Sequence, residues 1–321
     1  MKVYFCREGL RIIRELLQQE LPHDEVLECG PDGLATVVGE ADVLIPTITP
    51  LREEVLAGGR VRLIQQFGAG LDAVDIPAAT RHGIPVANVP AAGTGNAESV
   101  AEMAVLLMLT LARRFPEIQQ SLREGRVATP TGWALKGRTA VIVGYGGIGR
   151  ETARRLAGFE MRVLAVSRRG PKHTPEEDAV PVAHHYAEAG LHEALREADF
   201  VILAPPLNDA TRGLMGAAEF ACLKPSAYVV NVARGGVIDY DALLAALREQ
   251  RIAGAGLDVF WQEPIDPRDP ILGYNVIGTP HVGGATDLSL RGIARKVAEN
   301  IERVRRGELP ANCANPEVGP H

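Results

Sequence analysis

Short apolar runs alternate with longer amphipathic stretches along almost the whole chain. In the first 95 residues the apolar runs are KVYFC, EVLEC, DVLIP, VRLIQQF and PVANV, and stretches such as REGLRIIRELLQQE separate them. Continuous apolar strands that alternate with helices are typical of a parallel sheet covered by helices on both faces. The pattern therefore predicts one α/β unit at the start of the chain.

A long apolar helix and then a second alternation follow. We predict the helix over 96–115, with Asn96 as its N-cap, and expect it to be buried because it is apolar on nearly all sides. The next strands are TAVIVG, RVLAVS, FVILAP, AYVVNVA, AGAGLDV and NVIGTP. A last helix is expected over 287–308, returning to the first unit.

The length of the chain agrees with this division, because 321 residues exceed the size at which one core usually stops growing. We predict an α/β protein of two doubly wound domains with a cleft between them. A smaller, flavodoxin-like substrate domain is expected over 1–95 and 286–321, and a Rossmann nucleotide-binding domain over 96–285.

Charge and composition exclude several classes of protein. The formal net charge of −6 disfavours a nucleic-acid binder, which needs a dominant basic surface. The apolar run at 103–112 is about half the length that crosses a bilayer, and the first residues are too polar for a signal peptide. The four cysteines have no C-x-x-C spacing, so we expect no metal site and no disulfide. The cytoplasm is the expected location.

A glycine-rich turn indicates a nucleotide site. Gly144, Gly146 and Gly149 have G-x-G-x-x-G spacing directly after an apolar strand and directly before a helix. In this context the first glycine makes the tight turn, the second lets the backbone approach a pyrophosphate, and the third lets helix and strand pack closely. The N–H groups at the helix start favour negative charge. We therefore predict a dinucleotide cofactor.

The segment VSRRG ends the next strand, where a carboxylate usually binds the ribose 2′-hydroxyl of NAD. Ser167, Arg168 and Arg169 occupy this place. Ser167 can donate a hydrogen bond, and the two guanidinium groups can pair with a 2′-phosphate or stack beside the adenine. We predict a preference for NADP, with NAD possible. The alternative is that both arginines only solvate a loop.

Three further strand ends carry groups suited to the reduction of a 2-keto acid: NVARGGVID, GLDVFWQEP and GTPHVGGAT. Arg234 can grip a carboxylate in bidentate fashion. His281 is a natural proton donor to an alkoxide, and Glu263 beside it would favour and orient the imidazolium. Because open parallel sheets bind ligands at the carboxyl ends of their strands, we expect these three side chains to form one site.

Over nearly its full length the chain resembles the D-isomer-specific 2-hydroxyacid dehydrogenase family, through GYGGIG, NVARGGVIDYDALLAAL, AGLDVFWQEP and TPHVGGAT. The resemblance implies that Arg234 binds substrate, that His281 is the acid/base and that Glu263 is its partner. It also implies that Asp258 holds the nicotinamide carboxamide and that Ala233 lines the nicotinamide pocket. The remaining expected cofactor contacts are Pro205 and Pro206 on the adenosine side, with Gly147, Ile148, Gly283 and Gly284.

In the first domain, QQFGAGLDAVD resembles the loop by which this family binds the substrate carboxylate. The backbone N–H groups of Ala69, Gly70 and Leu71 would receive the carboxylate. A plain strand-to-helix turn is the alternative. GTGNAESVAEMA resembles the family's hinge and the start of a helix used in dimer formation, so a homodimer is expected.

The pattern is closest to the NADP-linked glyoxylate and hydroxypyruvate reductases, since VSRRG replaces an acidic strand end. We therefore expect reduction of a small, unphosphorylated 2-keto acid to the D-2-hydroxy acid. D-3-phosphoglycerate dehydrogenase is an alternative, although Thr47 stands where an arginine for the substrate phosphate would be expected and only Arg52 could replace it. A non-catalytic, nucleotide-sensing corepressor of the same fold is another alternative.

Overall fold

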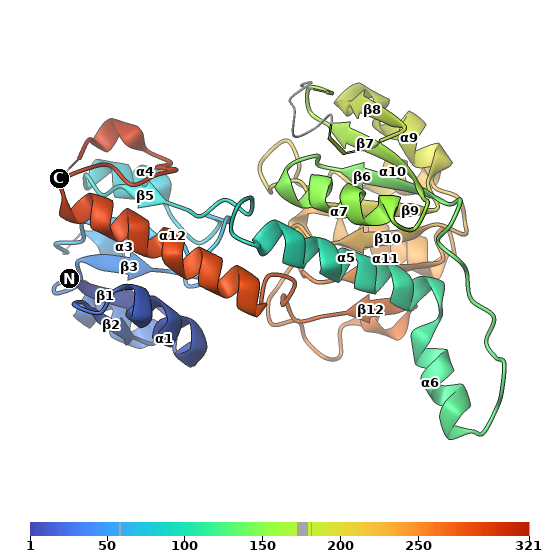
Figure 1. Cartoon of the computed structure of the whole chain (residues 1–321), viewed down its shortest axis with the longest axis horizontal. Coiled ribbons are helices and arrows are strands. Elements are labelled where there is room, and N and C mark those ends of the chain that lie inside the picture. The colour runs from blue at the N-terminus through green and yellow to red at the C-terminus, as the bar shows by residue number, and fades with distance from the viewer. Residues whose placement is uncertain (58, 172–178, 181, 321) are drawn as a thin grey trace. The chain divides into compact units, whose positions relative to one another are not determined.

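Two compact units make up the chain in the computed structural model, which describes residues 1–57, 59–171, 179–180 and 182–320. Unit 1 comprises Met1–Asn96 and Thr286–His321, and unit 2 comprises Ala97–Ala285. Each unit contains one parallel sheet with helices packed on it, so the predicted α/β class is confirmed. Figure 1 shows the elements of each unit.

The sheet of unit 1 has five parallel strands in the order β2-β1-β3-β4-β5. The strands are β1 (Lys2–Phe5), β2 (Glu25–Glu28), β3 (Val43–Ile45), β4 (Leu63–Gln65) and β5 (Val86–Ala87). Its helices are α1 (Arg11–Glu20), α2 (Leu34–Val37), α3 (Glu53–Leu56), α4 (Ile76–Arg81) and α12 (Asp287–Arg305).

Alternate residues of each strand in unit 1 face opposite sides of the sheet. On one side, Phe5 and Ile45 belong to the same buried cluster as Leu17 of α1 and Ile293 of α12. Leu44 packs on the other side among residues of α2, α3 and α4. Both faces of the sheet are thus covered, which explains why its strands read as continuous apolar runs.

Unit 2 contains a seven-stranded parallel sheet in the order β12-β11-β10-β9-β6-β7-β8. The strands are β6 (Thr139–Val143), β7 (Arg162–Ser167), β8 (His184–Ala187), β9 (Phe200–Leu203), β10 (Tyr228–Asn231), β11 (Gly254–Leu257) and β12 (Val276–Gly278). The helices are α5 (Asn96–Ala112), α6 (Phe115–Arg123), α7 (Gly147–Ala157), α9 (Leu191–Glu197), α10 (Ala217–Cys222) and α11 (Tyr240–Arg248).

The strand order reverses between β6 and β9, because the chain first builds outward through β7 and β8 and then returns to the other side of β6. Ligands of doubly wound sheets bind at such a switch point, beyond the carboxyl ends of the strands. Helices α5 and α7 cover one face of this sheet, and α9, α10 and α11 cover the other. The fold therefore gathers the loops that follow β6, β9 and β10 at one edge.

The single helix predicted over 96–115 is wrong at its C-terminal end, because α5 stops at Ala112 and a separate helix, α6, begins at Phe115. Arg114 between them has a left-handed backbone with φ of 54°. Pro116 lies in the first turn of α6, where it needs no N–H donor but would break a continuous helix. The last helix likewise ends at Arg305 and not at 308.

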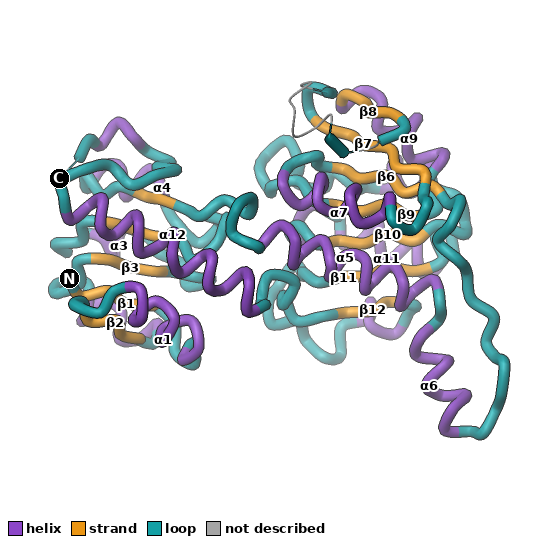
Figure 2. The backbone as a smooth tube through the Cα atoms, in the orientation of Figure 1, coloured by secondary structure: helices purple, strands orange, loops and turns teal. Residues whose placement is uncertain are grey.

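The expected burial of the long helix holds for much of α5 but not for all of it, since the Leu106 side chain is 53% exposed. Figure 1 shows α6 extending away from the sheet of unit 2, and Figure 2 shows that a long loop connects α6 to β6. In the described part of the chain, no helix is long and apolar enough to cross a membrane.

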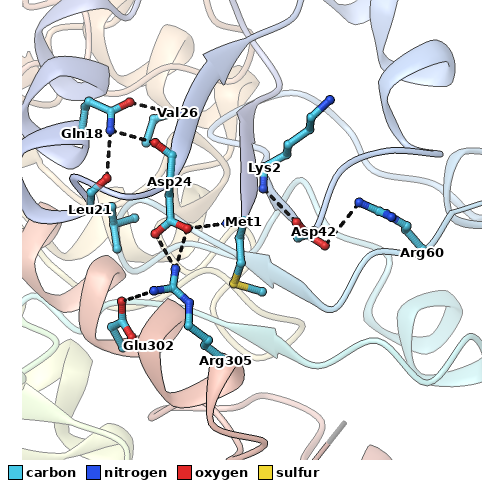
Figure 3. A network of polar contacts seen from close by, with 10 residues as sticks. All are labelled: Met1, Lys2, Gln18, Leu21, Asp24, Val26, Asp42, Arg60, Glu302 and Arg305. Atoms are coloured by element: carbon cyan, nitrogen blue, oxygen red, sulfur yellow. Dashed lines mark hydrogen bonds and ion pairs between the residues drawn. The ribbon is translucent and has the colours of Figure 1, made fainter.

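A buried charge network ties α12 to the sheet of unit 1 (Figure 3). The carboxylate of Asp24, whose side chain is 2% exposed, pairs with the guanidinium of Arg305 and with the amino group of Met1. Gln18 donates to the carbonyl oxygen of Asp24 at 2.9 Å and so fixes the turn between α1 and β2. Since a buried carboxylate needs paired charge, this network connects the C-terminal end of α12 to the turn between α1 and β2.

Candidate active site

The glycine-rich turn has the backbone that a dinucleotide needs. Gly144 has φ of 94°, and a Cβ atom there would lie 2.5 Å from the backbone nitrogen of Pro205. A Cβ atom on Gly149 would lie 2.2 Å from the carbonyl oxygen of Gly144, so α7 and β6 pack closely at this point. A Cβ atom on Gly146 would meet nothing within 4 Å, and no side chain caps the helix start. The turn thus leaves room and free donors for a pyrophosphate.

The end of β7 differs from expectation in one respect. The Ser167 hydroxyl lies 3.0 Å from the carbonyl oxygen of Gly170 and 2.8 Å from Nε2 of His185. A serine hydroxyl has a single proton, so its donor capacity is used within the chain. Arg168 and Arg169 are both exposed and form no ion pair with the described residues. At this strand end the two arginines, and not the serine, are available to an anion.

Gly147 and Ile148 form the start of α7, and the other expected cofactor residues lie on loops of unit 2. Pro205 is buried and Pro206 exposed directly after β9, and Ala233 is 6% exposed after β10. Asp258, which is 2% exposed, accepts hydrogen bonds from the Thr279 hydroxyl at 2.7 Å, from the Val282 N–H at 3.0 Å and from the Gly283 N–H at 2.9 Å. The carboxylate of Asp258 therefore organises the segment that carries His281. The sequence around Asp258 does not by itself indicate this role.

Glu263 and His281 are in direct contact. Glu263 Oε2 lies 2.7 Å from His281 Nδ1, and the N–H of Phe260 donates to Glu263 Oε1 at 3.0 Å. Burial raises the pKa of Glu263. The hydrogen bonds from His281 and Phe260 and the charges of His281 and Arg234 together outweigh burial, so the pKa lies below its ordinary value. Because an ionised carboxylate only accepts, Nδ1 of His281 carries a proton and Nε2 is left for proton transfer.

Hydrogen bonds to the backbone fix the segments that carry Arg234 and His281. The buried Asn231 at the end of β10 donates to the carbonyl oxygen of Arg234 at 2.9 Å and accepts from the N–H of Ala233 at 3.0 Å. The N–H of His281 donates to the carbonyl oxygen of Asp258 at 2.8 Å, and His281 has φ of 54°. A non-glycine residue in this conformation is uncommon and occurs preferentially at functional sites. Strands β10, β11 and β12 are neighbours, so the loops that carry the three groups are adjacent.

In unit 1 the predicted carboxylate loop follows β4. Ala69 is exposed, Gly70 and Leu71 are partly exposed, and within the described chain the N–H groups of these three residues donate to no acceptor. Sequence reasoning missed two residues that contact this loop: Gln66 donates to the carbonyl oxygen of Gly70 at 2.7 Å, and Asn88 donates to that of Ala69 at 2.6 Å. In the sequence, the only sign of these contacts is an amide residue shortly after each of two neighbouring strands, Gln66 after β4 and Asn88 after β5.

Groups of acidic, histidine and cysteine side chains with a metal-binding arrangement are absent from the residues that the structure describes. The side chains that converge after β10, β11 and β12 can bind a carboxylate and transfer a proton. The loop after β6 can hold a dinucleotide.

Comparison with known proteins identifies the family. Residues 105–283 match the family model described as D-isomer specific 2-hydroxyacid dehydrogenase, NAD binding domain. A glyoxylate reductase of Thermococcus litoralis is 35% identical, over 99% of this chain and 97% of that protein. A D-3-phosphoglycerate dehydrogenase of Methanocaldococcus jannaschii is also 35% identical, over 96% of this chain but 57% of that protein.

Among solved structures, an NADPH-dependent glyoxylate/hydroxypyruvate reductase of Sinorhizobium meliloti, in complex with NADP and malonate, aligns with a TM-score of 0.83 and 26% identity. The alignment covers 100% of this chain and 98% of that one. The chain therefore belongs to the D-isomer specific 2-hydroxyacid dehydrogenase family and is an NAD(P)-dependent oxidoreductase acting on CH–OH groups.

Proposed function

We propose that the protein reduces a small 2-keto acid of the glyoxylate or hydroxypyruvate type to the D-2-hydroxy acid, with NADPH as the preferred cofactor. The observation that carries the proposal is the 2.7 Å contact between Glu263 and His281, on loops adjacent to the one that bears Arg234. This set of groups matches the needs of carbonyl reduction: a cation for the carboxylate and a proton donor for the oxygen.

The roles of the residues follow from their chemistry. When bound, the cofactor supplies the hydride from its nicotinamide; the glycine-rich turn would hold its pyrophosphate and the Asp258 segment its nicotinamide. Arg234 binds the substrate carboxylate and polarises the adjacent carbonyl group. His281 donates the proton on Nε2 to the carbonyl oxygen, while Glu263 keeps Nδ1 protonated and the ring in position. In the oxidative direction the same Nε2 accepts the hydroxyl proton.

The preference for NADPH rests on the end of β7, where Arg168 and Arg169 are exposed and the described residues 167–171 include no carboxylate that would repel a 2′-phosphate. One or two charge-assisted hydrogen bonds would favour NADPH by about tenfold to several hundredfold. Arg168→Ala tests this preference, with Arg248→Ala as an exposed control on α11. We expect only Arg168→Ala to lower kcat/KM for NADPH selectively. Equal or better kcat/KM with NADH in the wild type would contradict the preference.

We also propose that the N–H groups of Ala69, Gly70 and Leu71 bind the carboxylate of the substrate. The three N–H groups of this loop donate to no acceptor within the described chain and are accessible from outside, which supports the assignment. Glycine at position 70 permits a close approach.

D-3-phosphoglycerate dehydrogenase remains the second candidate, since a relative with that name is as similar in sequence as the glyoxylate reductase. The structure favours an unphosphorylated substrate, because Thr47 bears no charge and its hydroxyl donates to the carbonyl oxygen of Pro46 at 2.7 Å. Arg52 is exposed and could bind a phosphate. The paired Glu263 and His281 argue against the non-catalytic alternative.

We further propose a homodimer located in the cytoplasm. Four exposed large apolar side chains lie close together in sequence on α5, on α6 and in the loop after it: Leu106, Phe115, Leu122 and Val127. A cavity of about 700 Å³ lies among residues 113–134. A second copy of the chain is the partner that would cover this surface.

The experiment that tests the proposed function is oxidation of NADPH and of NADH against a panel of 2-keto acids. The panel contains glyoxylate, hydroxypyruvate, pyruvate and phosphorylated hydroxypyruvate. We expect the highest kcat/KM for NADPH with glyoxylate or hydroxypyruvate. A higher kcat/KM for the phosphorylated compound would identify the second candidate, and no turnover with any of the four would refute the proposal.

A further inference from the structure

The carboxylate loop after β4 has a regular pattern of contacts on its carbonyl side. The carbonyl oxygen of Gly68 accepts from the N–H of Val89 at 2.8 Å. That of Ala69 accepts from Asn88 Nδ2 at 2.6 Å, and that of Gly70 accepts from Gln66 Nε2 at 2.7 Å. Three consecutive peptide groups are therefore held by their oxygen atoms.

The consequence for the N–H groups follows from peptide geometry. In a planar trans peptide the carbonyl oxygen and the N–H of the next residue point in opposite directions. Each held oxygen thus turns one N–H away from its anchor: those of Ala69, Gly70 and Leu71. These are the three N–H groups that donate to no acceptor in the described chain.

Gln66 connects this loop to a second one. The same Nε2 atom donates to the carbonyl oxygen of Thr47 at 2.8 Å, and Oε1 accepts from the N–H of Phe67 at 3.0 Å. Thr47 follows β3, which is the neighbour of β4, and its φ is 55°. Gln66 is 7% exposed, so its three hydrogen bonds are shielded from water and costly to lose.

We propose that Gln66 and Asn88 are positioning residues, whose side-chain amides hold the carbonyl oxygens of Gly70 and Ala69 so that the N–H groups of residues 69–71 are presented to the substrate carboxylate. This inference rests on the proposed function. It assigns no contact with substrate to Gln66 or Asn88. Their effect is on carboxylate affinity, because the peptide dipoles are fixed before the substrate arrives.

The variants Gln66→Met and Asn88→Ala test the proposal. Each removes the amide donor at one carbonyl oxygen of the carboxylate loop. Within the described chain the Asn88 side chain makes one hydrogen bond, to Ala69, so its variant keeps the test open if Gln66→Met fails to fold. A misaligned N–H loses a hydrogen bond to a charged group. We expect KM for glyoxylate and the inhibition constant of oxalate, a dicarboxylate analogue, to rise about tenfold or more, with a smaller change in kcat.

Two control variants separate positioning from general damage. Gln65→Met removes the fully buried glutamine at the end of β4, directly before Gln66. Its side chain contacts the carbonyl oxygens of Gln66 and Ala87 and the side chain of Asn300, but none of the residues 67–71. Asn275→Ala removes a comparable amide contact, to the carbonyl oxygen of Ala253 in unit 2. We expect both controls to keep the wild-type KM, even where stability falls, and all four variants to keep the wild-type Kd for NADPH.

The outcomes distinguish this inference from the proposed function. A wild-type protein that reduces no 2-keto acid refutes the proposed function, and the inference falls with it. A wild-type protein that reduces glyoxylate, with unchanged KM and oxalate inhibition in both Gln66→Met and Asn88→Ala, overturns the inference alone. Equal losses in Gln65→Met would also overturn it, because they would show a structural effect of the strand.

Discussion

Replacing Glu263 by glutamine removes the negative charge from the acceptor of His281 and leaves its shape nearly unchanged. The structure places Glu263 Oε2 2.7 Å from Nδ1 in a partly buried site, where 26% of the glutamate side chain is exposed. A hydrogen bond to a charged partner contributes about 1.5 to 3 kcal/mol, and one between neutral partners about 0.5 to 1.5 kcal/mol. The variant should therefore lose about 1.3 kcal/mol of stabilisation of the positively charged ring, which corresponds to about tenfold in kcat/KM.

The assay is kcat/KM for keto-acid reduction at pH 7. Reduction uses the proton on Nε2 of His281 while Nδ1 keeps its own, and the carboxylate of Glu263 faces Nδ1. In Glu263→Gln we expect kcat/KM to fall about tenfold, with the Kd for NADPH unchanged. A matched control is Glu219→Gln, since Glu219 Oε1 makes a similar 2.7 Å contact with His192 outside the site. A kcat/KM that stays at the wild-type value, or falls equally in the control, would refute the coupling of Glu263 to His281.

Three further predictions concern stability, assembly and the nucleotide turn. Burial opposes ionisation of Asp24, but the bonds of its carboxylate to the amino group of Met1 and to Arg305 outweigh that effect, so its pKa is lowered. Its contribution to the free energy of unfolding is therefore present above about pH 4 and is lost as pH falls through the lowered pKa. Asp24→Asn should lower the free energy of unfolding in urea by about 3 kcal/mol at pH 7 and by less near pH 3. An equal loss at both pH values would be inconsistent with this. Leu122→Glu, which charges a side chain that is 71% exposed, should shift sedimentation from the proposed dimer to monomer, and a dimer that is unchanged in the variant would rule out this surface. Gly146→Ala adds a Cβ atom where the chain leaves open space, so Tm should not fall. The added atom should weaken NADPH binding in a fluorescence titration, because it occupies the space expected for the pyrophosphate. Wild-type affinity would show that the cofactor does not approach there.

The parts of the fold that the sequence predicts are those encoded by local patterns. Most strands of both sheets are apolar runs, because both faces of the sheets are buried there. The glycine-rich turn is recognisable because Gly144 and Gly149 meet backbone atoms closely enough to exclude any Cβ atom. The adjacency of Arg234, Glu263 and His281 follows from the rule that ligands bind at the carboxyl ends of parallel strands.

Features that depend on distant partners were not predictable in this way. Strand β8 has the sequence HHYA, whose largely polar residues pair with β7 at the edge of the sheet, and no apolar run signals it. The Ser167 hydroxyl finds its partner His185 only through that pairing. Asn88 likewise meets the carbonyl oxygen of Ala69 because β4 and β5 are neighbours. Such contacts are set by tertiary structure and leave no periodic trace in the chain.

The most direct test of the account is kcat for glyoxylate reduction by His281→Ala, measured with saturating NADPH beside the wild type. His281 is the one group assigned to the proton, and its side chain is 39% exposed, so its loss should disturb folding little. The account predicts a fall in kcat of about 10²- to 10⁴-fold, with the Kd for NADPH unchanged. A variant with the wild-type kcat would contradict it, because the proton would then come from another source.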